Sequence, residues 1–359
     1  MNADRAHVFV GTYTPPLGDG AGIYRFELDA NGVLRPLGIT AGVHSPTYLA
    51  VGPASLYAAI RHDAGRAGLA GYAITGDGAG LRLTGTATIG QQALCYVRPS
   101  LSGRCALAAS FTGGTVALFP LDAAGRPGPV ACQVVHQGHG PVSGRQDRPH
   151  PHSVVPAPGG RFALVPDLGT DRVVSYLLDE DRRLVRHAET TAAPGSGPRH
   201  LIFHPGGRHA FVSNELDSTV SSYSWDGERG VLEPLQTART VPEAEAGRNR
   251  PADIHVHPSG RFVYVSNRGH DSIAQFAVHP RTGHLEYVGC APTQGAWPRC
   301  FAIDPSGRWL LAANQRSGSV ACFSVNQATG ALLAAGPPVP VPDPACVVIT
   351  GSPAGSGAS

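Results

Sequence analysis

The 359-residue sequence contains no lysine, so all 28 of its basic residues are arginines. A phosphate-binding P-loop, a kinase active site and a pyridoxal Schiff base each need a lysine side chain, so this absence excludes all three chemistries. Charge is also sparse, because charged residues make up 15% of the chain and the formal net charge is +2. The arginines are spread along the sequence rather than clustered, which argues against a nucleic-acid partner.

The number and spacing of the cysteines argue against a zinc site and against a disulfide framework. The seven cysteines are an odd number, and no two of them have the C-x-x-C spacing of a zinc site. Residues 1–10 lack the apolar core of a signal peptide, and no apolar run is long enough to cross a bilayer. We therefore expect a cytoplasmic protein with reduced thiols and no membrane partner.

Turn-forming residues, in contrast, are abundant. The chain has 46 glycines and 32 prolines, which is well above ordinary usage, yet these residues have no G-X-Y period and do not form low-complexity runs. Collagen and general disorder are therefore excluded. This composition favours many short strands separated by turns.

An internal repeat determines the predicted fold. Residues 201–208, 254–261 and 301–308 agree position by position, each with an apolar strand, a proline and a Gly-Arg pair. Weaker copies precede Arg104 and Arg161, and another, without the arginine, lies at 52–55. The spacings between successive arginines from Arg104 to Arg308 are 57, 47, 53 and 47 residues. Such a period is typical of the blades of a β-propeller.

The two ends of the chain supply a further blade. Six units are visible, and each alternates apolar and polar residues without a helical period. Residues 8–13 and 22–28 look like the second and third strands of a blade, and residues 345–349 look like a first strand. Joining them closes the ring and covers two open sheet edges. The sequence thus predicts an all-β fold, a seven-bladed β-propeller over residues 1–350, with a disordered tail at 351–359.

This topology brings distant residues together. In a propeller blade, the start of the first strand and the turn after the second strand lie on the same rim. That rim is rich in arginine and histidine, and guanidinium groups bind carboxylates or phosphates through paired hydrogen bonds. We therefore expect a pocket for a small anionic molecule. The residues at these positions are His150, His152, Arg199, His200 and Arg299 at strand starts, and Arg61, His62, Asp167, Asn214, Glu215, Asn267, Arg268, Asn314 and Gln315 at turns.

Repetition separates scaffold from candidate site. Three asparagines and four arginines recur at equivalent positions, which indicates turn capping and other structural roles; they are Asn214, Asn267, Asn314, Arg161, Arg208, Arg261 and Arg308. Arg199, Glu215 and Arg268 instead stand where sister blades carry other residues, as expected of a site built on a scaffold.

Metal binding is the weaker interpretation of the remaining polar residues. The His150-Pro151-His152 segment lacks an acidic cluster that would complete a metal site. Asp167 and Asp171 are better explained as residues that stabilise a turn. We therefore expect no metal and no cofactor.

Several motifs in order along the chain carry a family resemblance. They are Gly-Thr-Tyr-Thr at 11–14, Arg-Gln at 145–146, Pro-His-Pro-His-Ser at 149–153, Asp-Leu-Gly-Thr-Asp at 167–171, Gly-Pro-Arg-His at 197–200, Asn-Glu-Leu at 214–216 and Ser-Asn-Arg-Gly-His-Asp-Ser at 266–272. Together they resemble the propeller-type lactonase family, which includes bacterial 6-phosphogluconolactonases and fungal carboxy-cis,cis-muconate cyclases. The resemblance spans nearly the whole chain. It implies a seven-bladed propeller without a required metal, and an active site of one histidine, two arginines and one glutamate.

Carried over by motif, the catalytic residues are His152 (or its neighbour His150), Arg199, Glu215 and Arg268. Two rim segments depart from the family pattern. Arg61-His62 stands where Asn-Glu is usual, and Ser110-Phe111 where Asn-Tyr is common. The resemblance thus supports the catalytic set more strongly than it identifies the substrate.

We expect hydrolysis of a sugar-acid lactone, in first place 6-phospho-D-glucono-1,5-lactone of the pentose phosphate pathway. The two catalytic arginines would stabilise the oxyanion or hold the phosphate, and either Glu215 or His152 would deprotonate water. Substrate binding is assigned to His150, His200, Asn267, Arg299 and Gln315. The alternatives are a muconate-type lactonising cyclase that uses the same pocket, and a non-catalytic propeller that binds a protein partner. We expect a monomer or a weak homodimer.

Overall fold

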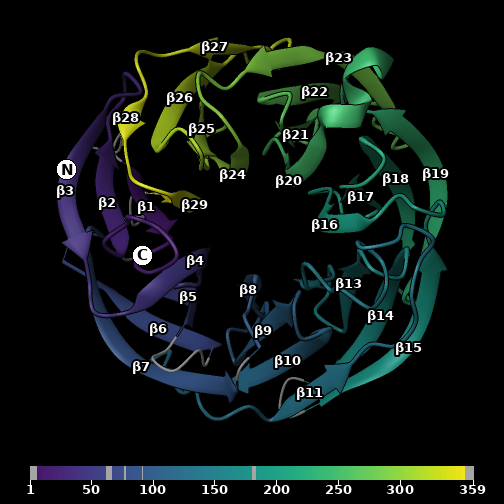
Figure 1. The fold of residues 1–359 in the computed structure, drawn as a ribbon, viewed down its shortest axis with the longest axis horizontal. Coiled ribbons are helices and arrows are strands. Elements are labelled where there is room, and N and C mark those ends of the chain that lie inside the picture. Colours follow the sequence, from purple (N-terminus) through teal and green to yellow (C-terminus); the bar gives the residue numbers. More distant parts are fainter. Residues whose placement is uncertain (1–5, 62–66, 77, 91, 180–182, 352–359) are drawn as a thin grey trace, which may run out of the picture.

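The strands of a computed structural model form seven antiparallel sheets around a central axis, which confirms the seven-bladed β-propeller (Figure 1). The structure describes residues 6–61, 67–76, 78–90, 92–179 and 183–351. Within this part of the chain, no helix is both long and apolar enough to cross a bilayer.

Each sheet runs from an inner strand near the axis to an outer strand at the surface. In that order, the first three sheets contain β29 (Pro344–Thr350), β1 (Ala6–Thr12), β2 (Ile23–Leu28) and β3 (Leu34–Thr40); β4 (His44–Val51), β5 (Ser55–Arg61), β6 (Ala67–Thr75) and β7 (Gly80–Gly90); and β8 (Tyr96–Pro99), β9 (Cys105–Ser110), β10 (Thr115–Pro120) and β11 (Cys132–Val135). The next two contain β12 (Val155–Pro156), β13 (Phe162–Asp167), β14 (Arg172–Asp179) and β15 (Arg183–Thr191); and β16 (Pro198–Phe203), β17 (His209–Asn214), β18 (Thr219–Asp226) and β19 (Val231–Arg239). The last two contain β20 (Arg250–Val256), β21 (Phe262–Arg268), β22 (Ser272–Val278) and β23 (Leu285–Pro292); and β24 (Pro298–Ile303), β25 (Trp309–Asn314), β26 (Ser319–Val325) and β27 (Leu332–Ala334), with β28 (Val339–Pro340) also paired to β26.

The two ends of the chain close the ring as predicted. β1 pairs antiparallel with β29, from His7 opposite Thr350 to Thr12 opposite Pro344, and β2 and β3 complete that sheet. Val8, Phe9 and Val10 in β1 are fully buried. The predicted disorder of the tail remains a prediction, because residues 352–359 lie outside the described part of the chain.

The inner strands of each blade are buried on both faces, because neighbouring blades pack against them. Every residue of β9, β13 and β17 is buried. Outer strands such as β3 and β15 are largely exposed. The continuous burial of these strands differs from the alternation of apolar and polar residues predicted for each unit, because neighbouring blades cover both faces of the inner strands.

The Gly-Arg pair of the repeat forms the turn between the first and second strands. Gly160, Gly207, Gly260 and Gly307 have φ angles of 73°, 72°, 74° and 75°, a left-handed conformation that glycine adopts without steric cost. The arginines that follow reach the neighbouring blade. Arg161 donates to Glu228 O at 3.5 Å, Arg308 donates to Ala30 O at 3.3 Å, and Arg261 donates to Gln327 O. These contacts agree with the structural role predicted for three of the four repeated arginines, and the role of Arg208 stays a prediction.

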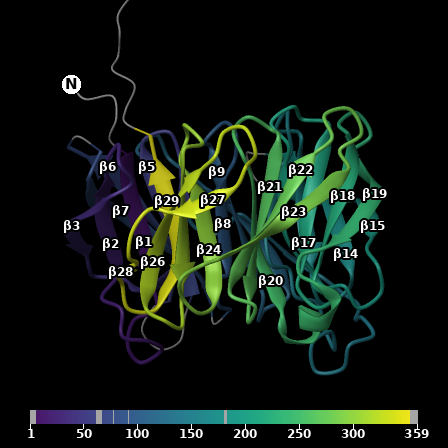
Figure 2. The ribbon, with the colours of Figure 1, turned by 90° about the horizontal axis from the view of Figure 1, so that it is seen from above.

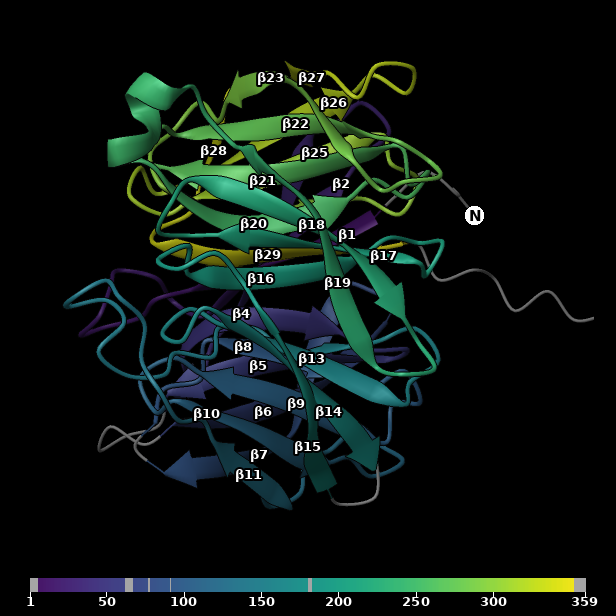
Figure 3. The same cartoon turned by 90° about the vertical axis from the view of Figure 1, so that its right-hand side faces the viewer.

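The propeller therefore has two different rims. The start rim carries the beginnings of the first strands, the turns between second and third strands, and the 3₁₀ helix η2 (Glu243–Arg248). The turn rim carries the Gly-Arg turns. Figures 2 and 3 show the ring from the side, with η2 on one rim and the end of β29 on the other.

Candidate active site

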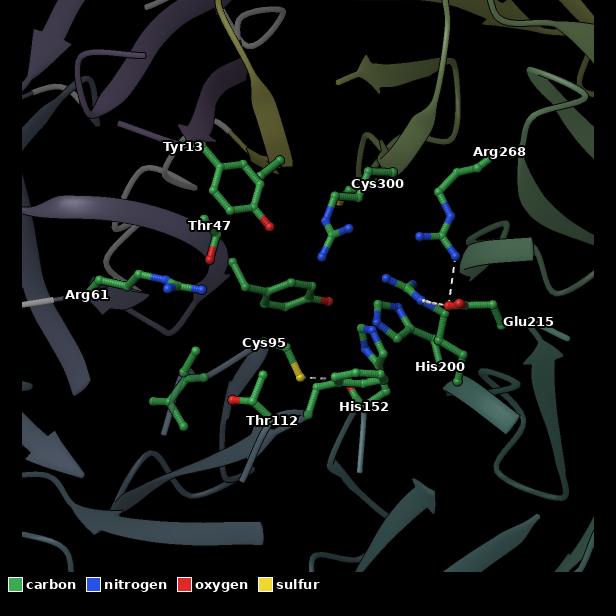
Figure 4. A pocket seen from close by; sticks show the side chains of 17 residues that line it. Tyr13, Thr47, Arg61, Cys95, Thr112, His152, His200, Glu215, Arg268 and Cys300 are labelled. Atoms are coloured by element: carbon green, nitrogen blue, oxygen red, sulfur yellow. Dashed lines mark hydrogen bonds and ion pairs between the residues drawn. The ribbon is translucent and has the colours of Figure 1, made fainter. Parts of the chain in front are cut away.

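A cavity of about 260 Å³ opens at the centre of the start rim, and all seven blades contribute to its lining (Figure 4). Its lining residues come from strand starts and from the turns between second and third strands, as the topology predicts. They are Tyr13, Thr47, Tyr48, Arg61, Ala93, Leu94, Cys95, Phe111, Thr112, His152, Arg199, His200, Glu215, Arg268, Arg299, Cys300 and Ala345.

The structure brings most of the predicted site residues to this cavity. All four residues assigned to catalysis line it, and so do two of those assigned to substrate binding; the six are His152, Arg199, Glu215, Arg268, His200 and Arg299. Arg61, which departs from the family pattern, lines it as well. Its neighbour His62 lies outside the described residues.

Three predicted substrate-binding residues do not line the cavity. The His150 ring stacks on Phe111, with 4.1 Å between ring centroids. The Asn267 side chain donates a hydrogen bond to Thr240 O at 3.1 Å. The backbone N–H of Gln315 donates to Trp297 O at 3.0 Å. These contacts support neighbouring turns and side chains of the start rim.

The carboxylate of Glu215 holds three arginines together. Arg145 Nη2 lies 2.5 Å from Oε1, while Arg199 Nε and Arg268 Nη2 lie 3.0 and 2.7 Å from Oε2. Burial alone would raise the pKa of Glu215, but the three positive charges outweigh burial and hold this pKa well below its ordinary range. Glu215 is therefore an ionised anchor for the arginines and a weak base.

Arg145 is a site residue that the sequence reasoning missed. It lies in the long connection between β11 and β12, outside the strand starts and turns on which the prediction was based. Gln146 fixes this connection, because its Nε2 donates to Leu168 O at 2.8 Å and to Asp171 Oδ1 at 2.7 Å. The Arg-Gln motif at 145–146, which is part of the family resemblance, was the sequence signal that could have identified Arg145.

Two buried imidazoles lie side by side in the cavity. The ring centroids of His152 and His200 are 5.2 Å apart. Burial, followed by the positive charge of Arg199, lowers the pKa of His152 well below its ordinary value and that of His200 to about 4. Both rings are thus neutral at neutral pH, and each has one nitrogen able to accept a proton.

Several buried polar atoms around the cavity have no hydrogen-bond partner among the described residues. They include His152 Nδ1, His200 Nε2 and Arg199 Nη1, and these side chains belong to residues that are at most 6% exposed. An unsatisfied buried polar group costs about 1–3 kcal/mol. The cavity is therefore suited to a ligand with several oxygen atoms.

The cavity is also strongly positive. Its lining contains four arginines and one carboxylate, that of Glu215. Burial lowers the pKa of Arg268 to about 9, which still leaves this guanidinium charged at neutral pH. Arg61 and Arg299 form no ion pair with any described residue, and Arg299 lies 6.0 Å from the centroid of the Tyr13 ring. Among the described residues, these two guanidinium groups thus have no carboxylate partner.

The other acidic residues of the start rim support its loops. Asp167 Oδ1 accepts hydrogen bonds from the backbone N–H groups of His150 at 2.7 Å and Gly169 at 2.9 Å. Asp171 accepts from Gly195 N at 2.6 Å and Gly197 N at 2.8 Å. Both observations confirm the turn interpretation. Among the described residues, no group of three or more His, Cys, Asp or Glu side chains is arranged to hold a metal ion.

Comparison with known proteins agrees with this architecture. The family model described as "Lactonase, 7-bladed beta-propeller" matches residues 7–349. A 6-phosphogluconolactonase of Bacillus subtilis is 34% identical over 299 residues, covering 82% of this chain and 84% of the relative. The solved periplasmic gluconolactonase of Pseudomonas aeruginosa has a TM-score of 0.91 and 31% identity, covering 97% of this chain and 100% of that one. A solved protein from Lactobacillus plantarum has a TM-score of 0.90 and 31% identity, over 96% and 99% of the two chains. The chain therefore belongs to the lactonase family of seven-bladed β-propellers and is a lactone-hydrolysing enzyme.

Proposed function

We propose that the lactone hydrolysed by this enzyme is 6-phospho-D-glucono-1,5-lactone, which is converted to 6-phosphogluconate. One observation carries this choice: four arginines face a cavity that contains a single carboxylate. A phosphate group supplies the missing negative charge and pairs with guanidinium through two hydrogen bonds. The name of the Bacillus subtilis relative supports the same substrate.

The arginines divide into two groups with different surroundings. Arg199 and Arg268 are fixed by Glu215 on one side of the cavity, whereas Arg61 approaches from the opposite side (Figure 4). We assign the fixed pair to the lactone carbonyl, because charge that is already oriented stabilises a developing oxyanion by about 3–4 kcal/mol. Arg61 and Arg299 are then available for the phosphate.

Hydrolysis needs a base that removes a proton from water as water attacks the carbonyl carbon. Glu215 is a poor candidate, because its three arginine partners depress its pKa. The neutral imidazoles of His152 and His200 are the remaining basic groups that line the cavity. We therefore assign the base to one of these rings and the alignment of the arginines to Glu215.

The test compares three substrates under the same conditions. Freshly generated 6-phosphogluconolactone, unphosphorylated glucono-1,5-lactone and a carboxylated muconate are assayed, with the spontaneous opening of each lactone subtracted. We expect the highest kcat/KM for the phosphorylated lactone. Arg61→Met should raise KM for that lactone and leave KM for glucono-1,5-lactone nearly unchanged. Equal kcat/KM for the two lactones would exclude phosphate recognition, and turnover of the muconate alone would identify a cyclase.

The proposal also includes a cytoplasmic location and a monomeric or weakly dimeric state. The seven cysteines, all within the described residues, are free thiols, which is compatible with a reducing compartment. Cell fractionation tests the compartment, and light scattering of the purified protein tests the assembly.

A further inference from the structure

The floor of the active-site cavity is a layer of side chains that fills the centre of the propeller. Its members are Tyr48, Tyr96, His200, Asp253, Cys300 and Cys346. Ring centroids are 4.4 Å apart between Tyr48 and Tyr96 and 5.3 Å apart between Tyr96 and His200. The Cys300 and Cys346 sulfurs are 3.5 Å apart. On the far side of this layer lies a second cavity, of about 240 Å³, which opens toward the turn rim.

Asp253 lies between the two cavities and contacts His200. The side chains of both residues are 4% exposed, and His200 Nδ1 is 2.9 Å from Asp253 Oδ1. The backbone N–H of Phe301 donates to Asp253 Oδ2 at 3.2 Å, and His255 Nε2 lies 3.1 Å from the same oxygen. His200 and Asp253 occupy equivalent positions of neighbouring blades, since they are 53 residues apart, as Arg208 and Arg261 are.

The protonation states of this pair follow from its contacts. Burial raises the pKa of Asp253, but the two histidines and their hydrogen bonds outweigh burial and bring this pKa well below its ordinary value. An ionised carboxylate only accepts hydrogen bonds, so the proton of neutral His200 must be on Nδ1. The lone pair of His200 is then on Nε2, a buried atom without a hydrogen-bond partner among the described residues, and His200 itself lines the active-site cavity. Asp253 thus fixes the tautomer in which Nε2 acts as a base.

His152 lacks such a fixed tautomer. Its Nδ1 has no hydrogen-bond partner among the described residues, so no carboxylate selects which of its nitrogens carries the proton. His152 lines the cavity beside His200, with 5.2 Å between the ring centroids. The two imidazoles therefore differ in one respect that the sequence motifs do not show: His200 has a carboxylate partner, and His152 has none among the described residues.

We propose that His200 is the base of the lactonase reaction and that Asp253 is the residue that positions it. This inference rests on lactone hydrolysis as the reaction, but not on the phosphate of the substrate. A water molecule that reaches the cavity floor transfers one proton to His200 Nε2 while its oxygen bonds to the carbonyl carbon, and the carbonyl π electrons move onto the oxygen beside the arginines. When the intermediate collapses, the ring C–O bond breaks, and the proton passes from Nε2 to the departing ring oxygen. The products are a hydroxyl group and a carboxylic acid, and His200 is neutral again.

The charged and titratable groups around His200 define its pH response. Arg199 and His255 oppose its protonation, and Asp253 favours it. The rings of Tyr48, Tyr96 and His152 pack against it. Loss of the Asp253 carboxylate should therefore change both the tautomer of His200 and the acidic limb of the pH profile of kcat.

The kinetic test uses His200→Asn and Asp253→Asn, with His284→Asn as the control. His284 is an exposed histidine of the turn rim that lines neither of the two cavities. We expect His200→Asn to lower kcat by about 100-fold to 10,000-fold, the usual contribution of a general base. Asp253→Asn should lower kcat by about 10-fold or more with little change in KM, because it alters orientation rather than substrate binding. His284→Asn should stay within about 3-fold of the wild type, because His284 lines neither cavity and surface substitutions have small effects.

A spectroscopic test measures the tautomer of His200 directly and needs no substrate. In ¹⁵N-histidine-labelled wild-type protein, long-range ¹H–¹⁵N correlation, with His200→Asn used for assignment, should show Nδ1 of His200 protonated and Nε2 unprotonated. Asp253→Asn should populate the other tautomer, and Asp253→Glu should partly restore both the tautomer and kcat. A wild-type His200 protonated on Nε2, or a His152→Asn variant that loses more kcat than His200→Asn, would overturn the assignment. A wild type that hydrolyses no lactone would instead contradict the reaction, and the tautomer measurement would still decide the role of Asp253.

Discussion

The two rims of the propeller are built from one repeat, but equivalent positions of successive blades are much more alike on the turn rim than on the start rim. On the turn rim, four Gly-Arg turns have nearly the same φ, and Arg161, Arg261 and Arg308 each donate to a backbone oxygen of the next blade. On the start rim, equivalent positions of successive blades carry His152, Arg199, Ala252 and Arg299. Repeated residues contact the next blade, whereas three of the varied start-rim residues, His152, Arg199 and Arg299, line the cavity.

The arginines of the two rims also differ in burial. Arg161, Arg208, Arg261 and Arg308 on the turn rim are exposed. Arg199 and Arg268 are 2% and 6% exposed, and both pair with Glu215. Exposed pairs contribute little to stability, whereas removing one partner of a buried ion pair is costly. Substitutions on the two rims should therefore have different consequences.

The largest effect is expected from removing the strand that closes the ring. Deletion of residues 343–359 removes β29 and leaves β1 without its inner partner. Two blade edges would then be exposed, so we expect aggregation or failed expression. Deletion of 352–359 alone retains β29 and should give normal yield. The solubility of the two truncated proteins is the measurement, and normal solubility of the longer deletion would contradict the closure.

Glu215→Gln should have the largest effect of any single substitution on the start rim. It removes the one carboxylate that pairs with Arg145, Arg199 and Arg268. We expect the free energy of unfolding to fall by about 3–5 kcal/mol, because buried positive charges lose their partner. Denaturant unfolding measures this loss, and lactonase activity should fall with it. Unchanged stability would show that the arginines do not depend on Glu215.

The pH dependence of stability should also arise from the start rim. The pKa of His200 falls from 6.5 in its ordinary state to about 4 in the folded protein, mainly through burial. Between these values the unfolded chain binds a proton that the folded chain rejects, so stability is highest above pH 6.5 and falls toward pH 4. This single group accounts for a loss of up to about 3 kcal/mol.

The measurement compares unfolding free energies of wild type and His200→Asn across that pH range. The variant should lose less stability toward acid than the wild type does. His284→Asn, at an exposed histidine on the turn rim, is the matched control and should retain the wild-type slope. Parallel slopes for wild type and His200→Asn would contradict the burial of a neutral His200.

The smallest effect is expected on the turn rim. Arg261→Met removes a hydrogen bond to Gln327 O and the contact with the Phe262 ring, whose centroid is 5.4 Å from the guanidinium carbon. Because Arg261 is exposed, we expect the free energy of unfolding to fall by less than about 1 kcal/mol. Thermal unfolding of the variant and the wild type measures this difference. A loss as large as that of Glu215→Gln would remove the distinction between the rims.

The sequence predicted the fold well because a repeat reports topology directly. The six repeat units and the two chain ends together predicted seven blades, and the apolar segment at 345–349 predicted the closure that β29 makes with β1. The topology then placed Arg199, Glu215 and Arg268 around one cavity. Each of these predictions depends only on where strands begin and end.

Contacts between blades were harder to predict. Arg145 reaches Glu215 from a long connection, and Asp253 reaches His200 from the next blade, so neither contact follows from the order of strands. Asn267 and Arg268 are adjacent in β21, and side chains of neighbouring strand residues point to opposite faces. Only Arg268 therefore lines the cavity, although the sequence placed both on the rim.

The central claim is that the start rim carries catalysis and the turn rim carries structure. Its most direct test is kcat/KM for the lactone in Arg268→Met and Arg261→Met, measured beside the wild type. We predict that Arg268→Met lowers kcat/KM by about 100-fold to 1,000-fold, as expected for loss of a group that stabilises the oxyanion, while Arg261→Met retains wild-type kcat/KM. Equal losses in both variants, or full activity in Arg268→Met, would contradict the account.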